Sequence, residues 1–401
     1  MKVLAMVLAG GKGERLYPLT RDRAKPGVPF GANYRIIDFT LSNCVNSDLR
    51  RIVILTQYKS FSLDRHIQHG WNFFSNQMGE YVDIIPAQQR VSEEWYQGTA
   101  NAVYQNIYTL EQERPDITLI LSGDHIYRMD YRKLIDFHIQ KGADLTVGAI
   151  PMPKETSTQF GVMVVDENYK IVGFQEKPEN PKTIPSDPDL ILASMGIYVF
   201  NTESMVKRVV EDAKCSDSSH DFGKNIIPNM IETDKVYAFP FFDEKTGKPA
   251  YWRDVGTIEA YWEAHMDLLS RDPEFSLLNR KWPIYTYEPP TPPAKIISVG
   301  IEGEGINNSI VSGGSLIVGS KVTNCVIGRN VSIYEGSEIT ESIIMDRARI
   351  GKGAKLKKVI IDKNVSIPEG MEIGISREED EKVFDVSEGG IVVIPKMTKF
   401  D

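Results

Sequence analysis

The sequence predicts an α/β domain with a mostly parallel, Rossmann-like sheet, followed by a parallel β-helix. Three observations predict this fold class. Up to about residue 270, short apolar runs alternate with longer amphipathic segments; a proline-rich stretch follows; beyond it, apolar residues recur every six positions. The first pattern is typical of a sheet with helices on both faces, and the last is typical of a β-helix.

Short apolar runs predict the strands of the first half, and the amphipathic segments between them predict its helices. The predicted strands are the apolar run Val3–Ala9, which breaks at Gly10, and Arg51–Thr56, Ile117–Leu121 and Asp144–Ile150. The predicted helices include Ala100–Glu113 and Tyr131–Lys141. In sheets of this kind, ligands bind at the carboxyl ends of the strands.

The chain changes character after residue 270. The segment Trp282–Pro293 contains five prolines, which neither a helix nor a central strand accommodates, and so predicts an extended linker. Beyond it, apolar triads with a six-residue step repeat every 17 residues: Ile310, Leu316 and Val322; Ile327, Ile333 and Ile339; Ile344, Ile350 and Leu356; Ile361, Ile367 and Ile373. Glycines repeat in the same register at Gly319, Gly336, Gly353 and Gly370.

These repeats predict a triangular coil in which one apolar side chain points inward from each wall. The recurring glycine would form one corner, because glycine accommodates a tight bend. An antiparallel β-sandwich is the alternative, but twelve apolar positions in register favour the β-helix. The predicted domains are therefore 1–270, a linker at 271–295, and the β-helix at 296–401.

Length, charge and cysteine content restrict the class of protein. A chain of 401 residues predicts two domains, and its net charge of −9 argues against nucleic acid, whose phosphates would repel an acidic surface. No run approaches the ~20 apolar residues of a membrane span, so no membrane partner is expected. Cys44, Cys215 and Cys325 are widely spaced without a CxxC pair, which indicates free thiols and a cytoplasmic location.

The first predicted strand leads into Gly10-Gly11-Lys12-Gly13. Glycines let the backbone approach a phosphate closely, so this loop is a candidate nucleotide site. Its spacing is not that of a Walker loop, and it lacks the full Gly-x-Gly-x-x-Gly of a dinucleotide fold. Taken alone, it fits a plain strand-to-helix turn equally well.

Two aspartates are candidate metal ligands. Asp124 follows the strand Ile117–Leu121, where α/β enzymes place metal-binding carboxylates, although aspartates there also cap helices and turns. Asp254 lies among aromatic and glycine residues, and Mg²⁺ bound with a triphosphate needs only one or two protein carboxylates. The candidate cations, each of which alone also fits a solvated surface position, are Arg15, Lys25 and Lys177.

Six motifs occur in order along the chain: Leu8–Leu16, Trp95–Ala100, Ser122–Tyr127, Phe174–Pro178, Ala193–Phe200 and Tyr251–Thr257. Together they resemble the motifs of the bacterial glucose-1-phosphate adenylyltransferase (ADP-glucose pyrophosphorylase) family of sugar nucleotidyltransferases. The segments specific to the ADP-glucose branch are Trp95–Ala100, Ala193–Phe200 and Ser219–Lys224. The resemblance covers essentially the whole chain and implies a nucleotidyltransferase domain followed by a left-handed parallel β-helix.

The resemblance implies transfer of the adenylyl group of ATP to α-D-glucose 1-phosphate, which gives ADP-glucose and pyrophosphate for glycogen synthesis. The attacking phosphate is already ionised, so the reaction needs neither a general base nor a covalent intermediate. Catalysis would rest on bringing two anions together and neutralising charge at the α-phosphate, with Mg²⁺ as the cofactor.

The resemblance also implies roles for individual residues. Those implied for the nucleotide are Gly10, Gly11, Gly13, Gln88, Gly98 and Thr99. Those implied for catalysis are Arg15 and Lys25 on the phosphates, and Asp124 and Asp254 as the Mg²⁺ ligands. Those implied for glucose 1-phosphate are Tyr96, Gly161, Glu176, Lys177 and Ser194, with Lys177 on the phosphate and Glu176 on sugar hydroxyls.

Three alternatives remain open from the sequence. A related enzyme could use UTP, GTP or dTTP, and base choice rests on the branch-specific segments alone. An enzyme whose β-helix also transfers acetyl groups is disfavoured, because the last histidine, His265, precedes the β-helix. A regulatory subunit without catalysis is disfavoured because all of the expected charged residues are present: Arg15, Lys25, Asp124, Lys177 and Asp254.

The β-helix is expected to serve assembly and regulation. The resemblance implies a homotetramer, or pairing with a paralogous subunit, because a solenoid wall offers a long surface for packing. It also implies regulation by glycolytic intermediates. Several relatives have a lysine three residues before the Lys25 position, but Asp22 stands here. We therefore expect no strong activation by fructose 1,6-bisphosphate, while Arg23 and Lys25 could bind another anionic effector.

Overall fold

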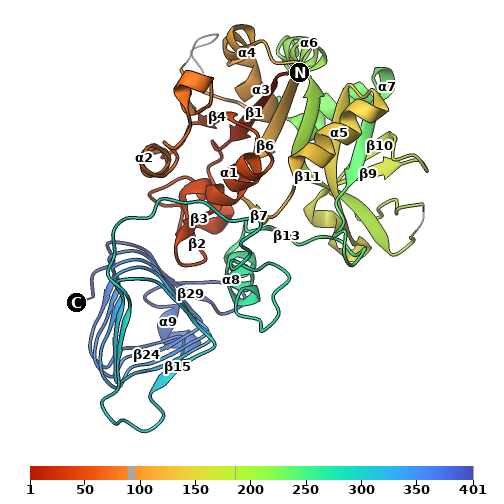
Figure 1. Ribbon diagram of the computed structural model, residues 1–401. Helices are drawn as coiled ribbons and strands as arrows, with labels where there is room; N and C mark the ends of the chain where they lie inside the picture. Colours follow the sequence, from red (N-terminus) through yellow and green to blue (C-terminus); the bar gives the residue numbers. More distant parts are fainter. Residues whose placement is uncertain (89–94, 186, 401) are drawn as a thin grey trace.

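A nine-stranded sheet forms the centre of the first domain in the computed structural model, which describes residues 1–88, 95–185 and 187–400 (Figure 1). The strands are β1 (Val3–Leu8), β4 (Arg51–Thr56), β5 (Tyr81–Pro86), β6 (Ile117–Ser122), β8 (Leu145–Pro153), β9 (Gly161–Val165), β10 (Ile171–Glu176), β11 (Leu190–Asn201) and β12 (Val236–Pro240). The main path is β10-β9-β11-β6-β1-β4-β5, and β8 and β12 extend from β11. Strands β6, β1, β4 and β5 run parallel, whereas β11 runs antiparallel to its neighbours β6, β8 and β9.

Helices cover both faces of this sheet. On β1, Ala5 and Val7 pack into one core with α1, α2 and α5, whereas Leu4 and Met6 pack into another with α3, α4, α6 and α7. These helices are α1 (Ile36–Asn46), α2 (Phe61–Gly70), α3 (Thr99–Tyr104), α4 (Ile107–Glu113), α5 (Tyr131–Lys141), α6 (Thr202–Asp212) and α7 (Ile227–Thr233). Helix α8 (Ile258–Asp267) packs instead in a core that includes residues of the second domain. Burial on both faces explains why β1 is a continuous apolar run, and the predicted fold class is confirmed.

The prediction of one helix over Ala100–Glu113 is wrong, because two helices, α3 and α4, occupy this segment. The break falls at Gln105 and Asn106. The Asn106 amide donates to the carbonyl oxygen of Ala102 at 2.7 Å and to the hydroxyl of Tyr96 at 2.9 Å. A side chain that binds a helix carbonyl competes with the backbone ladder. The break therefore fixes Tyr96, one of the predicted site residues.

The proline-rich segment is extended and lies along α1. The Asn46 amide donates to the carbonyl oxygen of Pro283 at 2.9 Å, and the indole of Trp282 donates to Asn43 at 2.9 Å. Further along, the Thr286 hydroxyl donates to the buried carboxylate of Asp38 at 2.7 Å. These contacts tie the segment to the first domain. The domain limits at 270 and 295 stay predictions.

The second domain is a β-helix of three parallel walls (Figure 1). The first wall contains β14 (Lys295–Ile297), β17 (Leu316–Val318), β20 (Ser332–Ile333), β23 (Arg349–Ile350) and β26 (Ser366–Ile367). The second contains β15 (Gly305–Asn307), β18 (Lys321–Thr323), β21 (Glu338–Thr340), β24 (Lys355–Lys357) and β27 (Glu372–Ile373). The third contains β16 (Ile310–Val311), β19 (Val326–Ile327), β22 (Ile343–Ile344), β25 (Val359–Ile361), β29 (Val392–Ile394) and the antiparallel β28 (Asp385–Val386). A short helix, α9 (Arg377–Asp380), precedes β28.

The predicted inward positions are correct except in the first triad. All nine residues of the later triads, and Val322, are buried in one core. The prediction that Ile310 and Leu316 point inward is wrong. Their neighbours Val311 and Ile317 hold the inward register instead, because Val311 pairs with Ile327 and Ile317 pairs with Ile333. Val322 follows Ile317 by five positions, whereas the corresponding step in the later coils, such as Ile333 to Ile339, is six positions. The first coil is therefore one residue short, and its register slips by one.

Each coil turns at residues with positive φ. The predicted glycine corner is correct, since φ is +48° at Gly319, +74° at Gly336, +67° at Gly353 and +68° at Gly370. Two further corners use residues other than glycine in the same conformation. These are Asn330, Arg347 and Asn364 at one corner, and Asn324, Glu341 and Lys358 at the other. Asparagine tolerates this conformation better than most residues, which explains part of the set.

A shared apolar core joins the two domains. Phe30 and Tyr261 of the first domain pack with Ile343, Met345 and Val393 of the β-helix.

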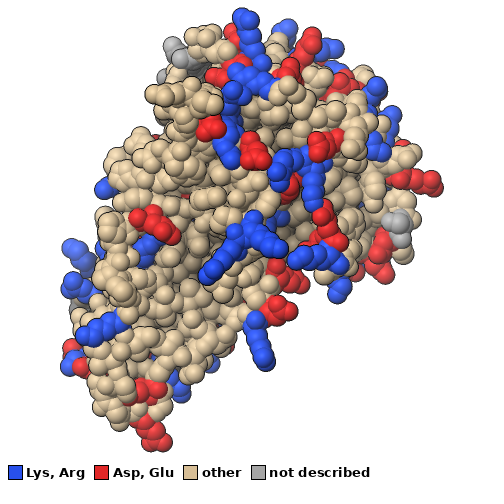
Figure 2. All heavy atoms as spheres, viewed as in Figure 1, with Lys and Arg blue, Asp and Glu red and all other residues tan. Residues whose placement is uncertain are grey.

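The acidic and basic side chains are intermixed over both domains on the face drawn in Figure 2. Among the described residues, none of the helices combines the length and apolarity that crossing a membrane requires.

Candidate active site

The glycine-rich loop follows β1 at the carboxyl edge of the sheet. Gly13 has φ +65°, and a Cβ there would lie 3.0 Å from side-chain atoms of Lys25 and Thr20. The loop then enters a short 3₁₀ helix, Glu14–Leu16. Among the described residues, the backbone N–H groups of residues 10–13 donate to no protein acceptor. These amides are therefore available to an anion.

The loop borders a cavity of about 690 Å³, a size that suits a nucleotide or sugar phosphate. The predicted site residues that line it are Gly10, Gly11, Gly13, Arg15, Lys25, Tyr96, Gly98, Thr99 and Asp124. These residues come from segments far apart in the sequence, and the fold brings them together around one space.

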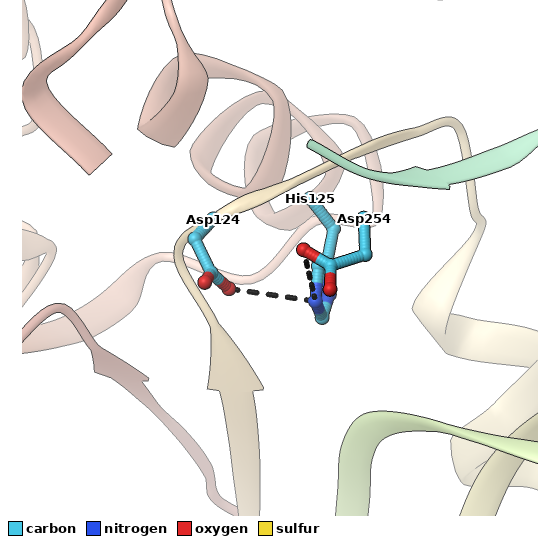
Figure 3. A group of neighbouring side chains, drawn as sticks. All are labelled: Asp124, His125 and Asp254. Carbon is cyan, nitrogen blue, oxygen red and sulfur yellow. Dashed lines mark ion pairs between the residues drawn. The ribbon is translucent and has the colours of Figure 1, made fainter. Parts of the chain in front are cut away.

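The two predicted metal ligands meet through a two-stranded sheet of β7 (His125–Tyr127) and β13 (Trp252–Asp254), in which Asp254 pairs with His125. One ligand atom each from Asp124, His125 and Asp254 lies within 4.8 Å of the others (Figure 3). The His125 Nε2 lies 3.5 Å from Asp124 Oδ1 and 4.0 Å from Asp254 Oδ1. Two carboxylates and an imidazole suit a divalent cation, so the donor set fits a metal ion.

Lys25 lies between the same two carboxylates. Its Nζ is 2.9 Å from Asp124 Oδ2 and 2.7 Å from Asp254 Oδ1. Burial lowers the pKa of Lys25, but Asp124 and Asp254 raise it by more, so the net pKa is raised. Burial likewise raises the pKa of Asp124, but Lys25 and His125 hold it well below its usual range. Both groups therefore stay charged at neutral pH.

Arg15 adds a second cation to this cluster. Its Nη2 lies 3.6 Å from Asp254 Oδ2, and its side chain is 69% exposed on the cavity rim. An exposed guanidinium at this distance contributes little as a structural ion pair and suits the phosphates of a ligand.

The predicted nucleotide segment is locked against residues 219–222. A Cβ at Gly98 would collide with the carbonyl oxygens of Ser219 and His220. The N–H of Ala100 donates to the His220 carbonyl at 2.8 Å, and the Thr99 hydroxyl donates to Asp221 at 3.0 Å. Gly98 is therefore required by close backbone approach, and its neighbour Thr99 is held beside Asp221.

The structure places Gln88 away from this cavity. It lines a separate space of about 170 Å³ with Gln105 and Asn106. Its implied contact with the nucleotide stays a prediction.

Of the residues predicted for glucose 1-phosphate, Tyr96 lines the cavity, whereas Gly161, Glu176, Lys177 and Ser194 do not. Gly161 and Glu176 are paired across β9 and β10, and Lys177 follows with φ +47° and its N–H donating to the Phe160 carbonyl at 3.1 Å. Ser194 lies on β11 two residues before Gly196, whose N–H donates to its hydroxyl at 3.4 Å.

Tyr198 connects these residues to the cavity, which it lines. Burial, then the charges of Asp221 and Glu176, raise the pKa of Tyr198, whereas a hydrogen bond with Ser194 lowers it.

Three residues were missed as site residues by the sequence reasoning: His125, Tyr198 and Asp221. All three lie inside motifs quoted above, so motif membership could have identified them. Their positions relative to one another could not be predicted from the sequence.

Asp22 lies outside the cavity at the contact between the domains. It pairs with Arg21 at 3.1 Å and with Lys396 of the β-helix at 3.8 Å. The expected lack of fructose 1,6-bisphosphate activation stays a prediction.

Comparison with known proteins finds a matching family model for each of the two domains. The family model for nucleotidyl transferases matches residues 4–271, and the GlmU-like, C-terminal hexapeptide model matches residues 292–394. The chain is 51% identical to the glucose-1-phosphate adenylyltransferase of Rhodopirellula baltica over 402 residues, which cover 98% of this chain and 90% of that one.

Two further relatives match over nearly their full length. The glucose-1-phosphate adenylyltransferase of Aliivibrio fischeri is 51% identical over 397 residues, 98% of each chain. Glucose-1-phosphate adenylyltransferase 1 of Vibrio cholerae is 53% identical over 400 residues, 99% of this chain and 98% of that one. Identity at this level over both domains shows that the chain belongs to the glucose-1-phosphate adenylyltransferase family.

Proposed function

We propose that this protein transfers the adenylyl group of ATP to α-D-glucose 1-phosphate and releases ADP-glucose and pyrophosphate. The observation that carries the proposal is one cavity lined by a glycine loop with free amides and by Lys25 and Asp124, with Asp254 paired to Lys25 at 2.7 Å. Such a site binds and neutralises anions, which is what this reaction requires, because it proceeds without a covalent enzyme intermediate. The product supplies glycogen synthesis, as the family assignment indicates.

In the proposed reaction, an oxygen of the sugar phosphate attacks the α-phosphorus of ATP, and pyrophosphate leaves from the opposite side. The amides of Gly10, Gly11 and Gly13 hold the nucleotide phosphates. Arg15 and Lys25 take up the charge of the leaving pyrophosphate. Because both substrates are anions, most of the rate enhancement comes from holding them together at short range.

Enzymes of this family use a divalent cation, and we propose that the cation is Mg²⁺. Asp124 and Asp254 would hold it, since hard oxygen ligands suit Mg²⁺. When bound, the ion supplies charge neutralisation at the α-phosphate. His125 lies close to both carboxylates, 3.5 Å from Asp124 and 4.0 Å from Asp254, and Trp252 packs edge-on against its ring with the ring centroids 4.9 Å apart.

We propose that glucose 1-phosphate binds on the β9–β11 side of the cavity. Lys177 would pair with its phosphate, and Glu176 would accept hydrogen bonds from sugar hydroxyls. Gly161 lies opposite Glu176 in this region, and its lack of a Cβ is required by packing, because a Cβ there would collide with the ring of Phe174. Tyr96 and Ser194 would complete the pocket.

We further propose that the protein is a homotetramer assembled partly through the β-helix. The first coils expose Ile296, Val299 and Ile301, and an apolar surface of this kind is covered in many oligomers. A paralogous partner subunit is the alternative, and mass measurement of the purified protein alone distinguishes the two.

The test of the function is pyrophosphate release from purified protein with glucose 1-phosphate, Mg²⁺ and ATP, UTP, GTP or dTTP in turn. Release with ATP alone supports the proposal. Preference for another nucleotide would keep the site but reject the adenylyl specificity. Absence of release with all four would favour a regulatory subunit.

A further inference from the structure

The ammonium group of Lys25 bridges the two aspartates that would hold the metal ion. Its Nζ is within hydrogen-bond distance of one oxygen of each, 2.9 Å for Asp124 and 2.7 Å for Asp254. The same carboxylates and His125 form the metal-compatible group whose ligand atoms lie within 4.8 Å of one another. A cation of either kind placed between these oxygens would make the same two contacts.

Charge repulsion prevents the Lys25 ammonium and a divalent cation from occupying this position at the same time. The two carboxylates carry two negative charges, and the Lys25 side chain, only 8% exposed, neutralises one of them directly. Arg15 contributes less, since it reaches only Asp254, at 3.6 Å, and is 69% exposed. A divalent ion entering beside Lys25 would meet a positive charge at close range and in a poorly solvated place.

The backbone and Cβ of Lys25 are held in place, and its ammonium group has a second position within reach. Its backbone lies in a short 3₁₀ helix, Lys25–Gly27, and its Cβ lies against Gly13 of the glycine loop. Lys25 also lines the cavity that contains the loop amides of Gly10 and Gly11. Rotation about the four side-chain bonds would carry the ammonium from the carboxylates toward phosphates bound by that loop.

We propose that the ammonium of Lys25 occupies the bridging cation position in the free enzyme, and that a divalent cation displaces it toward the phosphates when the nucleotide binds. This inference rests on the proposed function. The free enzyme then binds divalent cations weakly, and the nucleotide promotes cation binding because its phosphates take over Lys25. Metal and nucleotide thus enter as a pair.

The test measures Mn²⁺ binding by electron paramagnetic resonance, with and without ATP and without glucose 1-phosphate. Without ATP, Lys25→Met should bind Mn²⁺ about tenfold or more tightly than the wild type, because two unpaired carboxylates attract a cation strongly. Lys25→Arg, which keeps the charge, should stay weak. Lys12→Met removes another lysine of the cavity, 3.9 Å from Glu14, and should match the wild type without ATP.

Lys25→Gln provides a second neutral variant if Lys25→Met fails to fold, and the rise in Tm on adding Mn²⁺ provides a second readout. In both readouts the neutral variants should respond more than the wild type in the absence of ATP. Equal or weaker Mn²⁺ binding by the folded neutral variants would overturn the inference, even with normal binding by the wild type in the presence of ATP. Failure of the wild type to bind Mn²⁺ with ATP would instead reject the metal role in the proposed function.

Discussion

Arg23 and Asp362 form a buried ion pair that joins the two domains. Nη2 of Arg23 lies 2.8 Å from one carboxylate oxygen of Asp362 and 2.6 Å from the other, although the residues are 339 positions apart in the sequence. Both side chains are almost fully buried. The pair therefore fixes the β-helix against the segment that leads to Lys25.

Asp362→Ala should lower the free energy of unfolding by about 3–5 kcal/mol, because it leaves the Arg23 charge buried and unpaired. Urea unfolding followed by circular dichroism measures this. The matched control is Glu372→Ala, whose pair with Lys355 lies on the β-helix surface with both side chains 49% exposed. That variant should lose at most about 1 kcal/mol. Equal losses in the two variants would contradict the importance of the buried pair.

Asp124→Asn should lower kcat by about 10²–10³-fold while the KM values of both substrates stay within about threefold. The reason is that its charge acts at the α-phosphate mainly in the transition state. Steady-state pyrophosphate release measures both constants. A variant with near-normal turnover would remove Asp124 from the metal site.

Lys177→Gln should raise the KM for glucose 1-phosphate by about tenfold or more, with a small change in kcat and in the KM for ATP. The substitution removes the positive charge that would bind the phosphate of glucose 1-phosphate, and it leaves the residues around the α-phosphate of ATP unchanged. Lys182→Gln, at an exposed lysine further along the same segment, is the control and should behave like the wild type. An unchanged KM in Lys177→Gln would exclude that residue from the sugar-phosphate pocket.

Gly98→Ala and Gly11→Ala should separate folding from ligand binding. A methyl group at Gly98 would collide with backbone carbonyls of residues 219 and 220, so this variant should lose both thermal stability and nucleotide binding. A methyl group at Gly11 meets nothing within 4 Å, so Tm should stay unchanged while the KM for ATP rises. Thermal melts and kinetics on both variants check this. A normal KM for ATP in Gly11→Ala would argue against close approach of the phosphates to that amide.

His265 should make the protein sensitive to acid. The N–H of Gly31 donates to its Nε2 at 3.1 Å, and its Nδ1 therefore donates to the Tyr261 carbonyl at 2.8 Å. Burial lowers the pKa of His265 to about 4, against a smaller rise from the Tyr261 hydrogen bond. A proton on Nε2 would face the Gly31 N–H, so the neutral ring is the one that fits.

Because the pKa is lower in the folded state, the unfolded chain binds this proton first as the pH falls. The free energy of unfolding should therefore decrease from pH ~6.5 to pH ~4, by about 3 kcal/mol from this residue. His265→Gln, which can still donate and accept, should flatten that part of the profile measured by urea unfolding. His69→Gln, at an exposed histidine of α2, is the control. An unchanged slope in His265→Gln would show that other groups dominate the acid response.

Local patterns predicted the elements whose burial is uniform along their length. Strand β4 and helix α5 occupy the predicted residues, because one is buried on both faces and the other carries a regular apolar stripe. The break between α3 and α4 was missed, since it depends on Asn106 reaching Tyr96, a contact that no period encodes. The slip in the first β-helix coil was missed because a one-residue shortening leaves Ile310 and Leu316 in an unbroken numerical series.

The site was predictable as a set of residues but not as an arrangement. Motifs identified Lys25, Asp124 and Asp254 as members of one site, and the structure brings them into direct contact. That the lysine would lie between both carboxylates depends on the meeting of three segments, which the sequence does not specify. Asp221 acquires its place through the packing of residues 219–222 against Gly98, and Tyr198 acquires its place through the pairing of β11 with β6.

The left-handed corners of the β-helix limit how this protein can change length. Positions such as Asn330, Arg347 and Asn364 stand above one another at intervals of 17 residues, and each wall is bonded to the next coil along its whole width. Deletion of one residue before such a corner would move Val331 or Val365 into the place of Asn330 or Asn364, and a β-branched side chain tolerates that conformation poorly. Natural variants should therefore gain or lose whole coils, while single-residue differences collect at the open end, where one neighbour alone must be matched.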